Sequence, residues 1–219
     1  QQMAQKYFID YRDNRLYFPE DAYETLEKNY RERRYNSIEE YKKYIDDNRN
    51  EIATSVLSKY KVSEENGKKV YICLDQNNQY YFFTESSVMQ YTVREGKYNI
   101  DPEGFEEEYN NSLDETKAVR DVNRFIAMIN NKEYDFAYKI LEENFKNENF
   151  KTLEEFKEYI KNTFFDDNNV GYDDAKENNG KYICEATIVD NSNESKESIK
   201  KTFEITLLEG TDFNISFNK

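Results

Sequence analysis

An internal repeat constrains this chain more than any other feature. The segment NSIEEYKKYI at residues 36–45 recurs 115 positions later as KTLEEFKEYI at residues 151–160. At this offset the apolar positions of the two halves match while the polar positions differ, as expected for a duplicated unit whose core residues are constrained. The chain of 219 residues is therefore predicted to contain one unit twice. The matched apolar residues that precede the segment are Ala22, Tyr23, Leu26 and Tyr30 in the first copy and Ala137, Tyr138, Leu141 and Phe145 in the second.

Each copy of the repeated segment begins with a helix-capping pattern. Ser37 and Thr152 are each followed three residues later by a glutamate, Glu40 or Glu155. The hydroxyl can accept a hydrogen bond from a free N–H group at the helix start while the carboxylate reaches back towards the cap. The apolar residues behind the cap recur at helical spacing, so we expect one face of this helix to be buried in both copies. These residues are Ile38, Tyr41, Tyr44 and Ile45, matched by Leu153, Phe156, Tyr159 and Ile160.

Each copy then changes from helices to strands. SEENGKKVYIC (63–73) and AKENNGKYIC (175–184) both place Asn-Gly between extended stretches, which is typical of a hairpin because these residues tolerate positive φ. Apolar and polar residues alternate with period two at 203–207 and at 213–217. The first copy ends with EGKYNI where the second has EGTDFNI, and its weaker alternating strand is placed at Met89, Tyr91 and Val93.

These patterns predict an α+β fold with two tandem units. Each unit is expected to pack about three helices on one face of a curved antiparallel sheet of about four strands. We place the units at 1–104 and 112–219, joined by a linker near 101–115 where proline, glycine and the acidic run FEEEY interrupt the periodicity. Ser112 and Glu115 form another capping pattern, which predicts the first helix of the second copy. Its buried stripe is expected at Val119, Val122, Ile126 and Ile129.

The corresponding helix of the first copy is expected to be incomplete. Matching YFI (7–9) to RFI (124–126) places Gln1 opposite Ala118, inside the helix, with no cap and no initiator methionine before it. We therefore expect the chain to be a fragment or processed form of a protein whose upstream residues include a membrane anchor. No stretch of the sequence itself is apolar enough to cross a bilayer.

The charge of the chain argues against two classes of partner. The formal net charge is -14, and it is distributed evenly, with 16 basic and 22 acidic residues in 1–110 and 15 and 23 in 111–219. Nucleic acids and anionic lipid surfaces are bound through clustered lysine and arginine. We therefore expect neither as a partner. The basic cluster RERRY (31–35), at the end of the second helix, is interpreted as a solvated helix end, with an anionic partner of the first copy as the alternative.

The chain has no histidine, which limits its chemistry. This excludes nucleophiles that histidine activates, and it excludes metal sites with imidazole ligands. Catalysis would therefore rest on carboxylates, tyrosine, lysine or cysteine. Cys73 and Cys184 occupy equivalent positions in the repeat and are interpreted as buried structural thiols without a disulfide between them. The FEEEY run lacks calcium-loop spacing and is interpreted as a solvated linker. We assign no catalytic residue, cofactor site or metal ligand, and the ligand-binding residues stay undefined.

The two capped helices carry a family resemblance. Ala-Tyr-x-x-Leu (22–26 and 137–141) followed by Ser/Thr-x-Glu-Glu-aromatic (37–41 and 152–156) resembles the NTF2-like, or cystatin-like, superfamily, in two tandem copies. The bias towards Lys, Asn, Tyr and Glu is similar to extracytoplasmic regions of uncharacterised membrane-anchored proteins of low-GC Gram-positive bacteria. The family includes ketosteroid isomerase and scytalone dehydratase as well as paired non-catalytic domains of conjugation channels, and its catalytic positions do not map onto this chain residue by residue.

The resemblance leads to one functional expectation and to alternatives. We expect a non-catalytic protein-interaction or scaffold module, extracytoplasmic and anchored upstream, that works by protein contacts in an envelope or transfer assembly. The alternative is a carrier of a small apolar ligand, or an isomerase-like or dehydratase-like enzyme, that uses the cone between helices and sheet. A third hypothesis is that the chain is a regulatory domain of a sporulation or secretion system.

Overall fold

The computed structural model describes residues 2–65, 67–102, 104–192 and 197–219. The chain divides into two compact units, a first unit, Gln1–Tyr98, and a second unit, Asn99–Lys219. Each unit joins a set of helices to its own antiparallel sheet, of four strands in the first and five in the second among the described residues. The fold class is therefore α+β, as predicted. None of the described helices is long and apolar enough to span a membrane.

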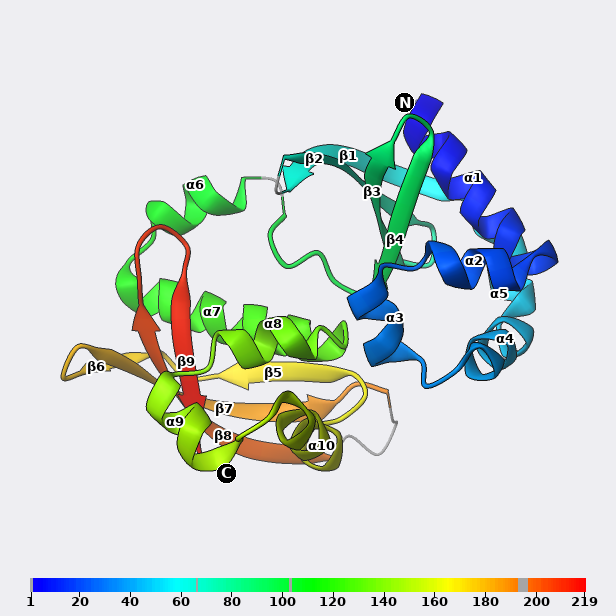
Figure 1. Cartoon of the computed structure of the whole chain (residues 1–219). Coiled ribbons are helices and arrows are strands. Elements are labelled where there is room, and N and C mark those ends of the chain that lie inside the picture. Colours follow the sequence, from blue (N-terminus) through cyan, green and yellow to red (C-terminus); the bar gives the residue numbers. More distant parts are fainter. Residues whose placement is uncertain (1, 66, 103, 193–196) are drawn as a thin grey trace. The chain divides into compact units, whose positions relative to one another are not determined.

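The first unit runs through its helices before its sheet (Figure 1). The sheet is a simple meander in the order β1-β2-β3-β4, with every neighbouring pair antiparallel. Helix α1 packs on it through aromatic side chains, because the ring of Tyr7 contacts those of Tyr71, Phe83 and Tyr91. Its elements are α1 (Gln2–Tyr17), α2 (Pro19–Thr25), α3 (Lys28–Arg34), α4 (Ile38–Asp47), α5 (Arg49–Thr54), β1 (Leu57–Glu65), β2 (Lys68–Asp75), β3 (Tyr80–Ser87) and β4 (Gln90–Gly96).

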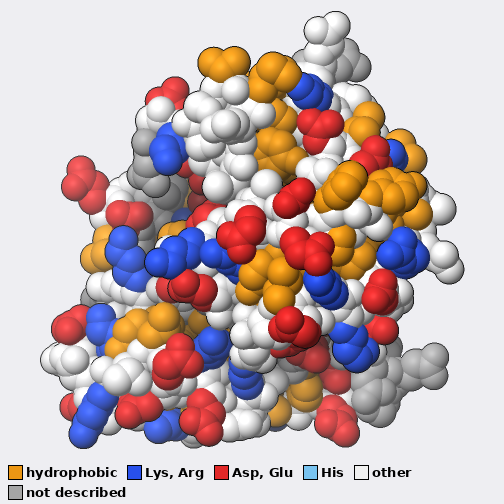
Figure 2. Space-filling view, turned by 45° about the vertical axis from the view of Figure 1, so that its right-hand side comes forward, with side chains coloured by type: hydrophobic (Ala, Val, Ile, Leu, Met, Phe, Trp, Pro, Cys, Tyr) orange, Lys and Arg blue, Asp and Glu red, His pale blue; other side chains and the backbone are white. Residues whose placement is uncertain are grey.

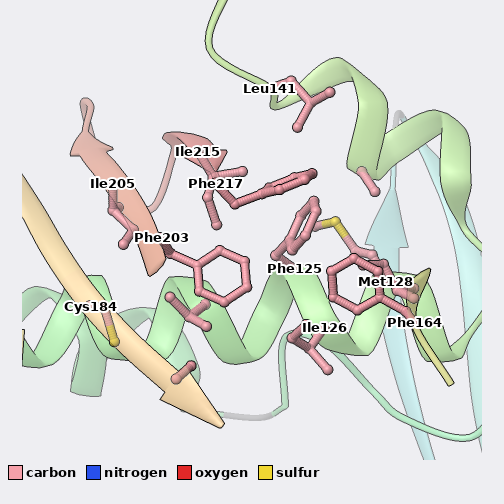
Figure 3. Close-up of a cluster of buried hydrophobic side chains, with 14 of the residues drawn as sticks. Phe125, Ile126, Met128, Leu141, Phe164, Cys184, Phe203, Ile205, Ile215 and Phe217 are labelled. Atoms are coloured by element: carbon pink, nitrogen blue, oxygen red, sulfur yellow. The ribbon is translucent and has the colours of Figure 1, made fainter. Parts of the chain in front are cut away.

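The second unit repeats this order of elements (Figure 1). Its sheet has the order β5-β7-β8-β9, and the short strand β6 also pairs with β7. Phe125 of α7 lies among Phe203 and Phe217 of the sheet, at the centre of a large apolar core (Figure 3). Its elements are α6 (Phe105–Asn110), α7 (Asp114–Asn130), α8 (Tyr134–Lys139), α9 (Glu143–Asn149), α10 (Leu153–Thr163), β5 (Asn168–Tyr172), β6 (Lys176–Asn178), β7 (Lys181–Asp190), β8 (Ser198–Leu207) and β9 (Phe213–Phe217).

A short extended segment divides the helices at the same place in both units. Between α2 and α3, Leu26 forms a parallel bridge with Val93, and the N–H group of Glu27 donates to the Val93 carbonyl at 2.8 Å. In the second unit Leu141 pairs with Ile215 in the same way. This break divides the expected second helix of each unit into two. With α5 in the first unit and α6 in the second, each unit has five helices among its described residues instead of the expected three. The break also reproduces the 115-residue offset of the sequence repeat.

The predicted capping residues of the repeated helix are confirmed. The hydroxyls of Ser37 and Thr152 each accept from the backbone N–H group three residues later, at 3.2 Å in both units. The Glu40 carboxylate accepts from the N–H group of Asn36 at 2.9 Å, one residue before the cap. The second unit repeats this contact at 2.8 Å. Helices α4 and α10 therefore begin with the same local chemistry.

The linker prediction is wrong in two details. The FEEEY run is helix α6 of the second unit, where Tyr109 is buried and donates to Asp121 at 2.7 Å. Ser112 does not cap α7, because its hydroxyl donates to the Glu108 carbonyl at 2.6 Å and so ends α6. Helix α7 begins after Leu113, with no side-chain cap. A hydroxyl that lies between two helices can serve either, and here it serves the preceding one.

The hairpins agree with the sequence in part. Asn179 and Gly180 both have positive φ in the turn between β6 and β7, as the Asn-Gly pattern predicts. Gly67 also has positive φ, whereas its neighbour Asn66 lies outside the described residues. Met89 is not in a strand, because it has a φ of 62° in the β3–β4 turn. The two EG sequences are not equivalent either: the first ends β4, and the second forms the β8–β9 turn.

The first sheet is apolar on both faces, whereas the sequence patterns predict one apolar face. Along β2 and β3 the residues that alternate with the core-facing ones form a second buried cluster of Val70, Ile72 and Phe82. In the second unit the equivalent face of β8 carries polar residues, such as Thr202 and Glu204. The expectation of one apolar face per sheet is therefore wrong for the first unit, whereas β8 of the second unit agrees with it.

Candidate functional site

The interior of the first unit contains a buried ion pair. Arg15 lies on the core-facing side of α1 and is 1% exposed, and Glu95 lies near the end of β4 and is 6% exposed. The Arg15 Nη1 atom is 3.4 Å from the Glu95 Oε1 atom. The helix places Arg15 one turn beyond Tyr11 on the same face, so an apolar stripe ends in a charge. Burying both charges is costly unless the surrounding groups also bond to them.

Tyrosine hydroxyls surround this ion pair. The Tyr11 hydroxyl donates to Glu95 Oε1 at 2.6 Å and lies 3.2 Å from the Tyr41 hydroxyl. The Arg15 Nη2 group donates to the Tyr81 hydroxyl at 3.3 Å. The guanidinium also lies over two of the rings, 4.7 Å from the centroid of Tyr11 and 5.1 Å from that of Tyr81. These contacts supply the compensation that a buried guanidinium and carboxylate need.

A second buried carboxylate closes the cluster. Asp75 ends β2 and is 2% exposed, and its Oδ1 atom accepts from the N–H groups of Asn77 and Gln79 in the turn that follows. Its Oδ2 atom accepts from the hydroxyls of Tyr81 and Ser55, both at 3.3 Å. Tyr81 therefore links the two halves of the network. The cluster combines two carboxylates and one guanidinium in the interior.

Burial keeps the tyrosine hydroxyls protonated. It raises the pKa of Tyr11 and Tyr41 well above the ordinary value, and the nearby Glu95 carboxylate raises both further. For Tyr44, burial and then Glu95 raise the pKa to about 12. At neutral pH these hydroxyls keep their protons, and the Tyr11 hydroxyl donates its hydrogen bond to the Glu95 carboxylate. The arrangement is suited to holding charge in place.

One atom of the cluster has no hydrogen bond. Arg15 Nε is buried, and none of the described groups accepts from it. Arginine has five N–H donors in a fixed plane, so orienting two of its nitrogens towards Glu95 and Tyr81 constrains the direction of the third. A small acceptor that reached Nε would be bound by a charge-assisted hydrogen bond.

The second unit shows what replaces this cluster when the polar groups are absent. Tyr81 and Glu95 are paired across β3 and β4, and Phe203 and Phe217 are paired in the same way across β8 and β9. The rings of Tyr35 and Tyr41 are 5.0 Å apart at 80°, and those of the equivalent residues, Phe150 and Phe156, are 5.3 Å apart at 74°. The equivalent pairs are Tyr11 and Phe125, Arg15 and Ile129, Tyr30 and Phe145, Tyr35 and Phe150, Tyr41 and Phe156, Tyr81 and Phe203, and Glu95 and Phe217.

Phenylalanine rings fill the interior of the second unit. The Phe217 ring lies 4.9 Å from Phe145 and 5.7 Å from Phe125, and four further rings lie within 6.3 Å of it. Aromatic rings at these distances gain from mutual edge-to-face contact as well as from burial. The same fold therefore has a polar interior in one copy and an aromatic interior in the other.

Sequence reasoning missed this site because the first helix was aligned in the wrong register. The match of YFI to RFI uses an offset of 117, whereas the buried residues of α1 and α7 agree at 114. With an offset of 114 residues, each of the five buried positions of α1 corresponds to a buried position of α7, and Arg15 corresponds to Ile129. The repeated substitution of tyrosine for phenylalanine was visible in the sequence and was the available signal.

Asp121 is a buried carboxylate on α7 of the second unit. Asp121 of α7 accepts from the Tyr109 hydroxyl and, at 3.0 Å, from Arg124 Nη1. Arg124 also donates to the Thr211 carbonyl and to Asp101. Burial raises the pKa of Asp121 to about 6, against the lowering effect of Tyr109 and Arg124. The hydrogen bond from Tyr109 to Asp121 joins α6 to α7, and α6 lies within the segment that the sequence predicted to be a linker.

The two cysteines are structural, as interpreted from the sequence. Cys73 of β2 and Cys184 of β7 are free thiols, and both are 0% exposed. Burial raises the pKa of Cys73 to about 12 and that of Cys184 to about 11. A thiol that stays protonated at neutral pH is a poor nucleophile and a poor metal ligand.

The basic cluster RERRY packs on rings of its own unit. Arg31 pairs with Glu24 at 2.8 Å and lies over the Tyr23 ring, and Arg34 lies over the rings of Tyr35 and Tyr44. The side chain of Arg33 lies outside those described. On the face that Figure 2 shows, Lys and Arg side chains are interspersed with Asp and Glu. Arg31 and Arg34 thus contribute to helix packing.

The comparisons with known proteins add no relative. No family model, curated protein or solved structure matches this chain. Among the residues that the structure describes, no group of three or more Cys, Asp or Glu side chains is arranged to hold a metal ion.

Proposed function

We propose that this chain is a non-catalytic protein-interaction or scaffold module, built from two NTF2-like units and belonging to the extracytoplasmic part of a membrane-anchored bacterial protein. It acts by contacts with other proteins in an envelope or transfer assembly. The order of helices followed by an antiparallel meander, present twice, supports the NTF2-like assignment. The acidic surface and the exposed apolar side chains support the interaction role.

One observation carries the non-catalytic part of this proposal: within each unit, the interior groups described above bond to or pack on one another, with Arg15 Nε as the exception. In the second unit six rings pack on Phe217. In the first unit Glu95 bonds to Tyr11 and Arg15, and Asp75 bonds to Tyr81 and to its own turn. An enzyme or carrier of this fold class presents such groups to a ligand in the cone. Here they serve packing and internal hydrogen bonding.

The test is site-specific photo-cross-linking in the host cell. A photoreactive residue replaces an exposed apolar side chain, Tyr17 (70% exposed) or Val88 (89% exposed), in the full-length protein. The control position is Lys43, whose side chain is 74% exposed but is paired with Asp47 in a polar setting. The proposal expects a discrete protein adduct from an apolar position and none from Lys43, in the membrane fraction. Full-length protein found free in the cytosol would contradict the localisation.

A small-ligand function of the first unit is the second candidate, favoured by the unbonded Nε of buried Arg15. It predicts that native mass spectrometry of the host protein detects a bound small molecule, and that the molecule raises the melting temperature with its concentration over Kd. The double variant Arg15→Met/Glu95→Met would lose this response, whereas Asp121→Asn in the second unit would keep it. A flat response to a broad panel of apolar and anionic compounds, with no bound mass, would remove this candidate.

A further inference from the structure

The two sheets differ at the edge formed by their first strands. In the first unit this edge is β1, one continuous strand of nine residues that pairs only with β2 among the described strands. In the second unit the same edge is divided into β5 and β6, with residues 173–175 between them. Short and interrupted edge strands prevent pairing with another chain. The second unit has this protection and the first does not.

The side chains of β1 are open to a partner. Tyr60 is 40% exposed and Val62 is 46% exposed, and alternation along the strand places both on the same face. Lys59, Glu64 and Glu65 are exposed as well. The pairing with β2 is irregular between Leu57 and Lys59 and regular from there to Glu65. The regular part, residues 59–65, has Val62 at its centre.

The charges of residues 59–65 would pair favourably with a second copy of the same segment only if the two copies ran antiparallel. Lys59 and Lys61 lie before Val62, and Glu64 and Glu65 lie after it. A parallel in-register copy would place lysine against lysine and glutamate against glutamate. An antiparallel copy centred on Val62 would place Lys59 opposite Glu65, and symmetry would form this pair twice. Lysines on an edge strand normally oppose pairing, and here the glutamates neutralise them.

We propose that β1 is a self-association edge at which a second copy of this chain adds its own β1 in antiparallel orientation, with Val62 opposite Val62. The two four-stranded sheets become one continuous sheet of twice that size. Backbone hydrogen bonds between the two edges supply the affinity, and the two Lys–Glu pairs set the register. The Glu65 carboxylate already lies 3.4 Å from Arg94 Nη2 on the same sheet and is 45% exposed, so it remains accessible to Lys59 of the second copy. The inference is independent of the partner in the proposed function.

The test is sedimentation velocity of the full chain over a range of concentrations, with charge-reversal variants. We expect a monomer–dimer equilibrium for the natural sequence. Lys59→Glu and Glu65→Lys should each raise the dissociation constant about tenfold or more, because each turns two attractive pairs into repulsive ones. The double variant Lys59→Glu/Glu65→Lys restores opposite charges and should recover the dimer. Raised salt should weaken association of the natural chain.

Lys176→Glu on the exposed strand β6 is the matched control, since it makes the same change on the interrupted edge of the second unit. It should leave the dissociation constant unchanged. A chain that stays monomeric at all concentrations would overturn the proposal. A dimer whose dissociation constant is unchanged by the β1 variants would overturn it as well. A double variant that stays dissociated while its circular dichroism and melting temperature match the natural chain would also overturn it.

Discussion

Glu95 and Phe217 are equivalent residues of the two units. Each lies on the last strand of its sheet and is paired with an aromatic residue of the strand before it, Tyr81 for Glu95 and Phe203 for Phe217. A charged carboxylate in one copy thus takes the place of the most heavily packed ring in the other. Arg15, which neutralises Glu95, takes the place of an isoleucine, Ile129. The two changes compensate one another, and each requires the other.

The ion pair yields the first prediction. Glu95→Met alone leaves the buried Arg15 without its counter-ion, and we expect it to lower the free energy of unfolding by about 3 to 5 kcal/mol. Arg15→Met alone should have a similar effect. The double variant should recover most of the loss, because no buried charge of the pair remains. Urea unfolding followed by circular dichroism measures the three values, and a double variant as unstable as the sum of the singles would disprove the coupling.

The repeat yields the second prediction. Leu26 and Leu141 are both 2% exposed and both bridge to the last strand of their sheet. Leu26→Ala and Leu141→Ala should each cost about 2 to 5 kcal/mol of unfolding free energy, because each leaves a cavity in an equivalent place. The control is Leu113→Ala at a position that is 75% exposed, where the loss should be small. A near-neutral result at either buried leucine would contradict the equivalence.

Asp121 yields a prediction about pH. Burial raises its pKa in the folded protein from 3.8 to about 6. Between these values the folded state retains a proton that the unfolded state has released, so this group makes the protein less stable as the pH rises from about 4 to about 6. The change is on the order of 2 to 3 kcal/mol.

Asp121→Asn cannot titrate and should remove this contribution to the slope of stability against pH. The comparison is Glu154→Gln, which removes a carboxylate whose side chain is 79% exposed and which pairs with Lys157 rather than with Arg124. Its slope between pH 4 and 6 should stay close to that of the natural chain. Melting temperatures measured across this range compare the three proteins. An unchanged slope in Asp121→Asn would show that the carboxyl group titrates normally.

The cysteines yield the last prediction. Because burial raises the pKa of both thiols, Cys73 and Cys184 should not react with a maleimide in the folded protein at neutral pH. In urea each should react as its own unit unfolds, so that mass spectrometry of the labelled peptides reports the two units separately. Ser58→Cys, at an exposed position of β1, should react at once and serves as the positive control. Rapid labelling of either natural cysteine without denaturant would contradict its burial.

Features that depend on local chemistry could be predicted from the amino-acid sequence. A cap such as Ser37 is recognisable because the hydroxyl and the N–H group that it bonds are three residues apart. The repeat of Leu26 as Leu141 is equally visible, because no insertion separates these helices in the two copies. The α+β class followed from the change of hydrophobic period, and it is confirmed.

Which residues meet in the interior depends on the packing of segments that are distant in the sequence. Helices α2 to α4 correspond to α8 to α10 at an offset of 115, and α1 corresponds to α7 at 114. The bridges instead place Val93 opposite Ile215 in the repeat, at an offset of 122. Strand and turn lengths between helix and last strand differ, so an alignment without gaps cannot pair Glu95 with Phe217. Tyr109 shows the same limit, because this buried residue bonds to Asp121, which lies 12 residues away in the next helix. Contacts between distant segments are set by packing, and local sequence patterns do not encode them.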